Sequence, residues 1–303
     1  MANYLWGIDL GGTKIEAAIL DADNAYEPVL RTRIPTEAKE GYEHIVSQIA
    51  KLVDMCSEKM GYRPTKIGIG TPGGIDPMTG TMKNSNTVAL LGKPLHKDLE
   101  VKLSMPVSMA NDANCFALAE TRMGIVAEKF PEAEVVFGVI MGSGVGGGVV
   151  INGKIINGKH GIGGEWGHNY LDESGGPCYC GLTGCVEKVI SGVNLEKYHQ
   201  ETYGEFLKLK EIVKRHKEGT DPQSTATVNR LIHFFGKGIS SVINVLDPDV
   251  IVLGGGVGNV DLLYTEGVES AKQFTFNPYL NTAFLKPKLG DSAGVFGAAF
   301  LVE

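Results

Sequence analysis

Three cysteines and one histidine lie close together in the sequence at spacings typical of a metal site. Cys178, Cys180 and Cys185 fall within eight residues, and His168 lies ten residues before the first of them. Three thiolates and one imidazole match the closed four-ligand sites that hold structural Zn²⁺. The alternative is a loop of free thiols, since a disulfide is disfavoured in a reducing compartment and leaves one thiol unpaired. We expect zinc, and because protein fills all four positions, we expect its role to be structural.

Two carboxylates flank these ligands. Glu165 precedes His168 by three residues, and Glu187 follows Cys185 by two. Carboxylates held beside a rigid metal loop can accept hydrogen bonds from sugar hydroxyls. The alternative is a pair of solvated acids.

A glycine turn near the start of the chain has the composition of a phosphate-binding loop. The segment Asp9-Leu10-Gly11-Gly12-Thr13-Lys14 follows an apolar strand pattern. Glycines allow backbone N–H groups to approach a phosphate, Thr13 adds a hydroxyl, and Lys14 adds a positive charge. Asp9 can hold a water on Mg²⁺. The alternative is a plain hairpin turn, and the Walker A spacing is missing.

Two later glycine turns strengthen this interpretation. Gly142-Ser143-Gly144-Val145-Gly146-Gly147-Gly148 has five glycines in seven positions after an apolar strand, and Gly254-Gly255-Gly256 follows another. The first is expected to hold phosphates and the second to allow close approach of a flat nucleoside. The alternatives are close strand packing for the first and a helix start without ligand for the second. Three such turns in one chain are more specific than any single one.

The pair Asn111-Asp112 ends a short strand pattern and is a candidate for proton transfer. A carboxylate at Asp112 can accept the proton of a hydroxyl that attacks a γ-phosphoryl group, and Asn111 can hold a neighbouring hydroxyl. The alternative is that Asp112 caps a helix over residues 113–123, a role that Asp often fills. The local sequence favours the cap, and both roles can hold at once.

The elements that must position these residues occur twice along the chain. Strands are predicted over residues 4–9, 15–20, 28–34, 66–70, 107–110, 135–141 and 249–253, and helices over 41–61, 226–246 and 293–302. Each half has a strand with a glycine exit, a hairpin, helix and a later strand. This duplication predicts an α/β fold of two lobes with a cleft between them. We expect an N-terminal lobe of residues 1–112 with the helix 292–303, and a C-terminal lobe of 113–291 with the zinc loop 160–190.

Composition excludes several classes of protein. The 303 residues include 41 glycines and carry a net charge of −7, so the basic surface expected of a nucleic-acid-binding protein is absent. No apolar run is long enough to cross a membrane, and the start shows no signal-peptide pattern. We therefore expect a cytoplasmic protein, with Cys56 and Cys115 as buried thiols.

Six segments follow one another in the expected order between residues 9 and 187: Asp9-Leu10-Gly11-Gly12-Thr13-Lys14, Gly70-Thr71-Pro72-Gly73, Asn111-Asp112-Ala113-Asn114, residues 142–148, Glu165-x-Gly167-His168, and Cys-x-Cys-Gly-x-x-Gly-Cys-x-Glu ending at Glu187. Together they resemble the ROK family (repressor, open reading frame, kinase), and the last two segments are the most specific. The resemblance implies a duplicated actin/hexokinase-like (ribonuclease H-like) fold, ATP with Mg²⁺, phosphoryl transfer to a hexose, and a homodimer.

The same resemblance assigns roles to residues. Asp112 is implied to be the base, and the sugar contacts are Asn111, Glu165, His168 and Glu187, with His168 also a zinc ligand. The ATP contacts implied are Gly11, Gly12, Thr13, Lys14, Gly142, Ser143, Gly144, Val145, Gly146 and Gly147 at the phosphates and Gly254, Gly255 and Gly256 at the adenosine, with Asp9 towards Mg²⁺.

The sugar is expected to be D-fructose, phosphorylated at the 6-hydroxyl, because several segments look most like bacterial fructokinases of the Mak type. N-acetylglucosamine, glucose and mannose stay open, since one or two pocket contacts decide between such sugars. N-acetylglucosamine kinases tend to have Phe where Trp166 stands. Only eight residues precede Asp9, which leaves no room for the DNA-binding domain of ROK repressors. A non-catalytic sugar-binding regulator and an actin-like polymerising ATPase are the remaining alternatives.

Overall fold

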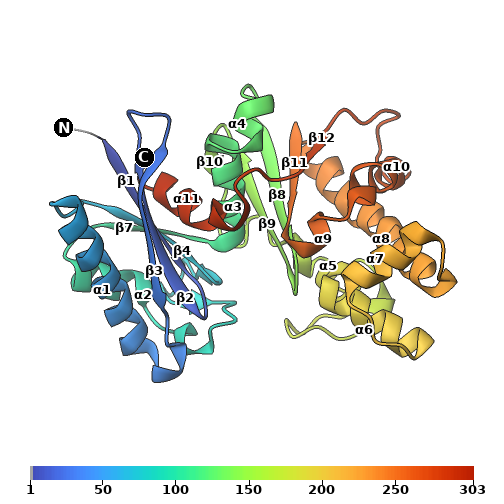
Figure 1. The fold of residues 1–303 in the computed structure, drawn as a ribbon, viewed down its shortest axis with the longest axis horizontal. Helices are drawn as coiled ribbons and strands as arrows, with labels where there is room; N and C mark the ends of the chain where they lie inside the picture. Colours follow the sequence, from blue (N-terminus) through green and yellow to red (C-terminus); the bar gives the residue numbers. More distant parts are fainter. Residues whose placement is uncertain (1–2) are drawn as a thin grey trace. The chain divides into compact units, whose positions relative to one another are not determined.

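A computed structural model describes residues 3–303, so the first two residues of the expected N-terminal lobe lie outside the described part (Figure 1). By its internal contacts the chain forms two compact units. Unit 1 comprises Met1–Pro131, Gly148–Gly163 and Lys288–Glu303, and unit 2 comprises Glu132–Gly147 and Gly164–Pro287. The contacts therefore divide the chain elsewhere than at the expected boundary after Asp112. That boundary, which follows the repeat in the sequence, stays a prediction.

The first sheet has five strands in the order β3-β2-β1-β4-β7. They are β1 (Tyr4–Leu10), β2 (Lys14–Asp21), β3 (Glu27–Pro35), β4 (Ile67–Thr71) and β7 (Val107–Asn111). β1, β2 and β3 pair antiparallel, whereas β1, β4 and β7 run parallel. The carboxyl ends of the three parallel strands therefore lie at one edge of the sheet.

The second sheet repeats this plan in the order β10-β9-β8-β11-β12. Its strands are β8 (Val135–Met141), β9 (Val145–Ile151), β10 (Lys154–Ile155), β11 (Val250–Gly254) and β12 (Ala283–Leu285). β9 and β10 form an antiparallel hairpin, and β8, β11 and β12 are parallel. The expected duplicated α/β fold is thus confirmed. A further hairpin joins β5 (Gly74–Ile75) to β6 (Met82–Lys83).

Eleven helices occur among the described residues. They are α1 (Tyr42–Met60), α2 (Leu95–Leu103), α3 (Asp112–Arg122), α4 (Ile125–Lys129), α5 (Val186–Ile190), α6 (Gly192–Tyr203), α7 (Leu209–Glu218), α8 (Pro222–Leu246), α9 (Gly255–Gly258), α10 (Glu266–Lys272) and α11 (Ala293–Phe300). The longest, α8, begins four residues earlier than predicted because Asp221 caps it and Pro222 occupies its first turn. Elsewhere the predicted bounds agree with the structure to within a few residues.

The side chains of β1 point alternately to the two faces of the first sheet. Trp6, Ile8 and Leu10 are buried in one apolar core together with α1. Gly7 points the other way, where a Cβ would lie 2.4 Å from the backbone nitrogen of Ala299 in α11. The close approach of α11 requires glycine there. Asp9 shares that opposite face, where a Cβ on Gly294 of α11 would lie 3.4 Å from its carboxyl group.

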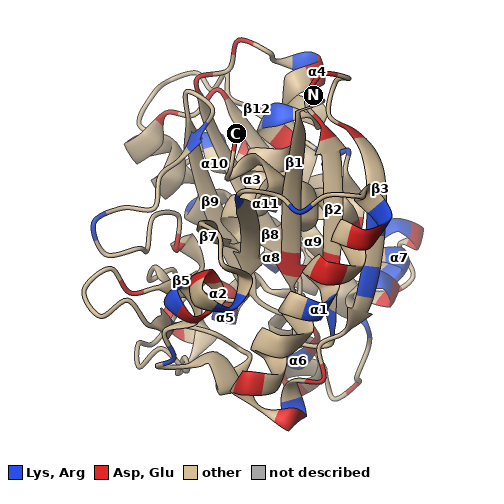
Figure 2. Ribbon diagram, turned by 90° about the vertical axis from the view of Figure 1, so that its left-hand side faces the viewer, with Lys and Arg blue, Asp and Glu red and all other residues tan. Residues whose placement is uncertain are grey.

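The basic residues at and before α7 lie on a surface that they share with acidic side chains. Lys208 binds Glu196, and Arg215 binds Glu205 and Glu211. Lys and Arg therefore stand next to acidic side chains along α7 (Figure 2). No helix within residues 3–303 is long and apolar enough to cross a membrane.

Candidate functional site

The predicted residues of unit 1 meet at the carboxyl edge of its parallel strands. Asp9 on β1 pairs in register with Gly70 on β4, and Thr71 pairs with Asn111 on β7. Asp112 follows directly as the first residue of α3. Strand ends separated by about a hundred residues in sequence therefore bring two carboxylates and an amide to one place.

The helix cap belongs to Asn111, so the expectation that Asp112 caps the helix is wrong. The Asn111 Oδ1 accepts a hydrogen bond from the Asn114 N–H at 2.8 Å, because the extended backbone of Asn111 places its side chain beside the first turn. Asp112 Oδ1 accepts from the neighbouring Ala113 N–H, at 2.8 Å, and from no described residue further along the helix that an N-cap would reach. The Asp112 side chain is thus free of the capping role and is reached by solvent.

Both carboxyl groups are held in surroundings that disfavour their charge. Burial raises the pKa of Asp9 to about 6, and the nearby charges of Asp112 and Glu16 raise it further. Removal of water by the surrounding protein also raises the pKa of Asp112, although solvent still reaches one side of it. Two carboxylates with raised pKa values relieve their charge when a divalent cation binds. The donor set therefore fits Mg²⁺, which takes one or two carboxylates together with phosphate oxygens.

The first glycine turn is tied to the sheet by a residue that sequence reasoning missed. The Gly11 N–H donates to the Lys14 carbonyl at 3.0 Å, which closes the turn. Thr36, fully buried, donates from its N–H to the Thr13 carbonyl at 3.0 Å and from its hydroxyl to the Gly11 carbonyl at 2.6 Å. The turn carbonyls are thereby turned towards β3. The signal in the sequence that could have revealed Thr36 is a polar residue directly after the strand that pairs with β2.

The glycine turn of unit 2 contacts a predicted sugar residue. β9 begins at Val145, so the second half of this turn is already strand. The Val145 N–H donates to Glu187 Oε2 at 3.0 Å, and a Cβ on Gly144 would lie 2.5 Å from the same oxygen. The absence of a side chain at Gly144 makes this contact possible, and it fixes one carboxylate oxygen of Glu187. Ser143 is exposed at the tip of the turn.

The third turn lies at the same edge of the second sheet. Gly254 ends β11 opposite Ile140 of the parallel strand β8. Gly255 has a φ of 78°, and a Cβ there would lie 2.3 Å from the Met141 carbonyl oxygen. Only glycine fits this conformation and this distance. The two glycine turns of unit 2 are therefore neighbours, as the sequence predicted.

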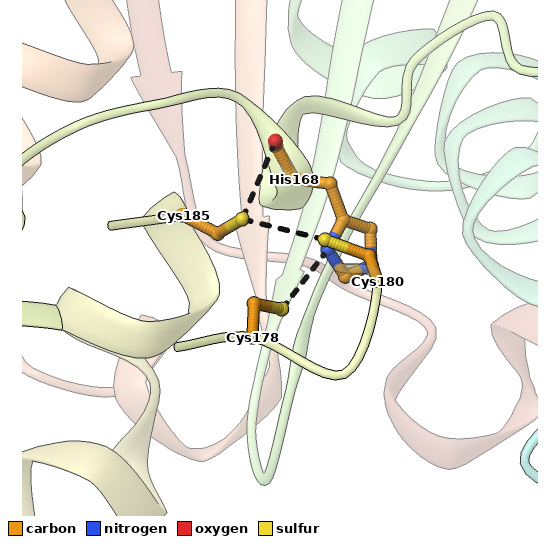
Figure 3. Close-up of side chains that lie close together, drawn as sticks. All are labelled: His168, Cys178, Cys180 and Cys185. Atoms are coloured by element: carbon orange, nitrogen blue, oxygen red, sulfur yellow. Dashed lines mark hydrogen bonds between the residues drawn. The ribbon is translucent and has the colours of Figure 1, made fainter. Parts of the chain in front are cut away.

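The four predicted metal ligands converge (Figure 3). The ligand atoms of His168, Cys178, Cys180 and Cys185 all lie within 4.8 Å of one another. Cys178 Sγ lies 3.7 Å from His168 Nδ1, and Cys180 Sγ lies 3.6 Å from Cys185 Sγ. Tetrahedral zinc with bonds of about 2.3 Å to sulfur separates its ligands by roughly 3.8 Å. The residues present thus fit a closed zinc site, and Nδ1 is the histidine nitrogen that faces it.

Tyr179, between two of these cysteines, is a second residue that sequence reasoning missed. Its hydroxyl lies 3.0 Å from His168 Nε2, and the two rings meet edge to face. Burial and the charges of Glu187, Cys178 and Glu165 raise the pKa of Tyr179 to about 12, so the hydroxyl stays protonated. The hydroxyl and the His168 ring are therefore held to each other within the zinc loop.

Trp166 anchors the segment that carries Glu165 and His168. Its indole N–H donates to the Gly238 carbonyl on α8 at 3.0 Å, and its ring packs edge to face on Phe137 of β8. The side chain is buried, so the short helical turn from Trp166 to His168 is fixed to the body of unit 2.

The structure therefore brings the predicted residues together in two groups. Asp9, Asn111, Asp112 and the first glycine turn gather in unit 1. Glu165, Glu187, the zinc ligands and the other two glycine turns belong to unit 2. Cys56 and Cys115 are buried free thiols, as expected.

Known proteins resemble this chain over its whole length. The sequence pattern of the ROK family matches residues 5–303. An N-acetyl-D-glucosamine kinase of Aliivibrio fischeri is 36% identical over 306 aligned residues, which cover 98% of each chain. A ROK hexokinase from Thermus thermophilus superimposes with a TM-score of 0.86 at 32% identity, covering 99% of this chain and 97% of that one.

A ROK family glucokinase from Streptomyces griseus, solved with glucose and AMPPNP, superimposes with a TM-score of 0.76 at 27% identity over 99% of both chains. The relative from Aliivibrio fischeri is named for N-acetyl-D-glucosamine, one of the alternative sugars. The expected resemblance to fructokinases therefore gains no support from it.

Proposed function

The chain belongs to the ROK family, and we propose on that premise that it transfers the γ-phosphoryl group of ATP to the 6-hydroxyl of a hexose. The observation that carries the proposal is the pair of carboxylates, Asp9 and Asp112, whose pKa values are raised at the carboxyl edge of parallel strands. Strongly perturbed acids of this kind mark functional sites.

Asp112 is proposed as the general base. Its raised pKa makes it a better proton acceptor than an ordinary Asp, and helix capping by Asn111 leaves its carboxylate available. The carboxylate takes the proton of the 6-hydroxyl as the sugar oxygen bonds to the γ-phosphorus. The bond from that phosphorus to the β,γ-bridging oxygen breaks, and the electron pair leaves with ADP.

Asp9 and the glycine turns are proposed to hold the nucleotide. Asp9 would bind Mg²⁺ directly or through water, and the cation would neutralise charge on the β- and γ-phosphate oxygens. Backbone N–H groups of residues 11–14 and 142–147 would donate to the phosphates, and Gly254 to Gly256 would lie by the adenosine. Zinc, bound by His168 and the three cysteines, would keep Glu165 and Glu187 in place.

N-acetyl-D-glucosamine is the first candidate substrate, ahead of D-fructose, because the relative at 36% identity is named an N-acetyl-D-glucosamine kinase. The proposed sugar contacts are Asn111, Asp112, Glu165, His168 and Glu187. A homodimer stays a prediction that light scattering of the purified protein can check.

The test compares wild type with Asp112→Asn across four sugars in a coupled ADP-release assay: N-acetylglucosamine, fructose, glucose and mannose. Asp23→Asn, in an exposed turn of the same unit, is the matched control. We expect Asp112→Asn to lower kcat by at least about a hundredfold, since a positioned base contributes 10²–10⁴-fold. The control should keep full activity. Near-normal turnover by Asp112→Asn would end the assignment of the base, and sugar binding without turnover by wild type would favour a regulator.

A further inference from the structure

The first glycine turn has one face bound to protein and one face open. The carbonyl groups of Gly11 and Thr13 both accept hydrogen bonds from Thr36, at 2.6 Å from its hydroxyl and at 3.0 Å from its N–H. The N–H groups of Gly12 and Thr13 donate to no other group within residues 3–303, and both residues are exposed. The turn therefore keeps its carbonyls on the protein and offers free N–H donors, as an anion site requires.

The Thr36 hydroxyl sets the direction of one of these donors. The carbonyl of Gly11 and the N–H of Gly12 belong to one trans peptide group, which is planar, so they point in opposite directions. Because the hydroxyl holds the carbonyl towards β3, it also holds the Gly12 N–H pointing away from β3. Thr36 thus fixes a donor on the open face, although it is itself fully buried.

Without this hydrogen bond, the peptide group between Gly11 and Gly12 would be able to turn over. A peptide plane rotates through coupled changes of ψ in the residue before it and φ in the residue after it. Glycine has the widest range of both angles, so two consecutive glycines resist the rotation least. A reversed group would present a carbonyl oxygen where an anion needs a donor. The freedom of the two glycines is therefore useful for binding only when another residue holds the group.

The segment that carries Thr36 is itself fixed by helix α1. Gln48 Nε2 donates to the Pro35 carbonyl at 3.1 Å and to Glu37 Oε2 at 2.9 Å. His44 Nε2 lies 2.7 Å from the same oxygen of Glu37. Both chain neighbours of Thr36 are thereby bound to α1, and the Gln48 side chain is buried. The hydroxyl is held on a rigid support.

We infer that Thr36 is a positioning residue of the phosphate-binding turn, whose hydroxyl keeps the Gly12 N–H directed at a phosphate oxygen of the nucleotide. This inference rests on the proposed function and adds to it a residue that touches neither ATP nor sugar. The hydrogen bonds of Thr36 end on the glycine turn and not on the proposed sugar contacts, so its removal acts on nucleotide binding.

The experiment uses the full-length protein and two variants. Thr36→Val keeps the shape of the side chain and removes the hydroxyl, whereas Thr36→Ser keeps the hydroxyl. Thr121→Val is the matched control, because the Thr121 hydroxyl also donates to a backbone carbonyl of unit 1, that of Ala117 at 2.7 Å. Calorimetry measures the dissociation constants of MgADP and of the sugar that wild type turns over best, each alone. Kinetics give kcat and KM for ATP and for sugar.

We expect Thr36→Val to raise KM for ATP and the dissociation constant of MgADP about three- to tenfold, the size of one lost hydrogen bond. Its KM and dissociation constant for sugar should stay unchanged. Thr36→Ser and Thr121→Val should bind MgADP as wild type does. A purely structural role would instead impair nucleotide and sugar alike.

A second measurement keeps the inference testable if Thr36→Val does not fold. In wild type labelled with isotopic glycine, the amide signal of Gly12 should shift when MgADP binds. Gly12→Ala assigns this signal by its loss, and its Cβ would lie no closer than 3.4 Å to a neighbouring atom, Thr87 Oγ1.

Three results would overturn the inference: unchanged MgADP affinity in Thr36→Val, a Thr36→Ser variant as impaired as Thr36→Val, and a Gly12 amide signal that MgADP does not move. If wild type phosphorylates none of the four sugars but Thr36→Val binds MgADP more weakly than wild type, the proposed function fails and the role of Thr36 stands. An active wild type with a normal Thr36→Val variant refutes the role of Thr36 alone.

Discussion

Replacing Asp9 by Asn should stabilise the protein, although it should abolish the proposed activity. The pKa of Asp9 is raised from 3.8 to about 6 by burial and by the charges of Asp112 and Glu16. The folded state therefore binds a proton more tightly than the unfolded state. A difference of about two pKa units corresponds to roughly 3 kcal/mol. At pH values above the folded-state pKa, the ionised carboxylate lowers the free energy of unfolding by this amount.

The sign of the pH dependence follows from this difference. Below about pH 4 the carboxyl group is protonated in both states, so it contributes no penalty. Between about pH 4 and 6 the unfolded state loses its proton first, and the stability of wild type falls as the pH rises. Asn resembles the protonated acid at all pH values. We therefore expect the free energy of unfolding of Asp9→Asn to exceed that of wild type by about 2–3 kcal/mol at pH 8 and by almost nothing at pH 3.

Urea denaturation without Mg²⁺ and nucleotide measures this difference, since a bound cation would offset it. The protein has two tryptophans, Trp6 on β1 of unit 1 and Trp166 in unit 2. On a Trp166→Phe background, the emission of Trp6 follows the unit that contains Asp9. Measuring Asp9→Asn and its reference on this one background cancels the cost of that change.

Asp261→Asn is the control with the opposite sign. Because Asp261 lies in unit 2, the emission of Trp166 on a Trp6→Phe background follows it, and each variant is compared with its own background. Two lysines, Lys286 at 2.6 Å and Lys217 at 2.9 Å, hold the pKa of Asp261 down to about 2. Its ionised form stabilises the fold above about pH 4, so its removal should destabilise more at pH 8 than at pH 3. Our reasoning fails if Asp9→Asn is less stable than wild type at pH 8, or if its gain is the same at pH 5 and pH 8.

Two further predictions concern the zinc site and the glycine turn of unit 2. Cys185→Ser should reduce the zinc content from about one ion per chain and lower the free energy of unfolding by more than about 3 kcal/mol, because loss of a metal is among the large effects on stability. Elemental analysis and calorimetry measure the two changes, and a metal-free wild type of full stability would contradict this prediction. Gly144→Ala should push the Glu187 carboxylate aside and weaken sugar binding, because its Cβ would lie 2.5 Å from Glu187 Oε2. Its cost in stability should stay below about 1 kcal/mol, since that oxygen ends a flexible side chain. Gly142→Ala, with no atom within 4 Å of its Cβ, should leave sugar binding unchanged, and equal losses of sugar affinity in the two variants would refute the argument.

Features that depend on neighbours in the chain were predictable from the sequence. The apolar spacing of α1 places Ile45, Ile49 and Leu52 in the core, as predicted. The cysteines Cys178 and Cys185 lie close together because the loop between them is short and rich in glycine. Strand β8 has the predicted bounds because its apolar run ends in glycines.

Features that depend on backbone conformation or on distant elements were not predictable. Asn111 and Asp112 are equally good caps by type, and the extended backbone at Asn111 decides between them. Thr36 closes the first glycine turn only because β3 pairs beside β2. The contact of the Tyr179 hydroxyl with His168 Nε2 depends on which ring nitrogen faces the cysteines, which no spacing reveals.

By itself the sequence determined the duplicated α/β plan and the chemical groups of the site, because periodicity, glycine turns and ligand spacing are local properties of the chain. Which side chains share an environment depends instead on how distant strands pair. Asp9 and Asp112 are about a hundred residues apart, and it is the parallel pairing of β1, β4 and β7 that brings their charges close enough to raise the pKa of Asp9. Long-range pairing of this kind depends on the packing of the whole sheet, which no short segment encodes.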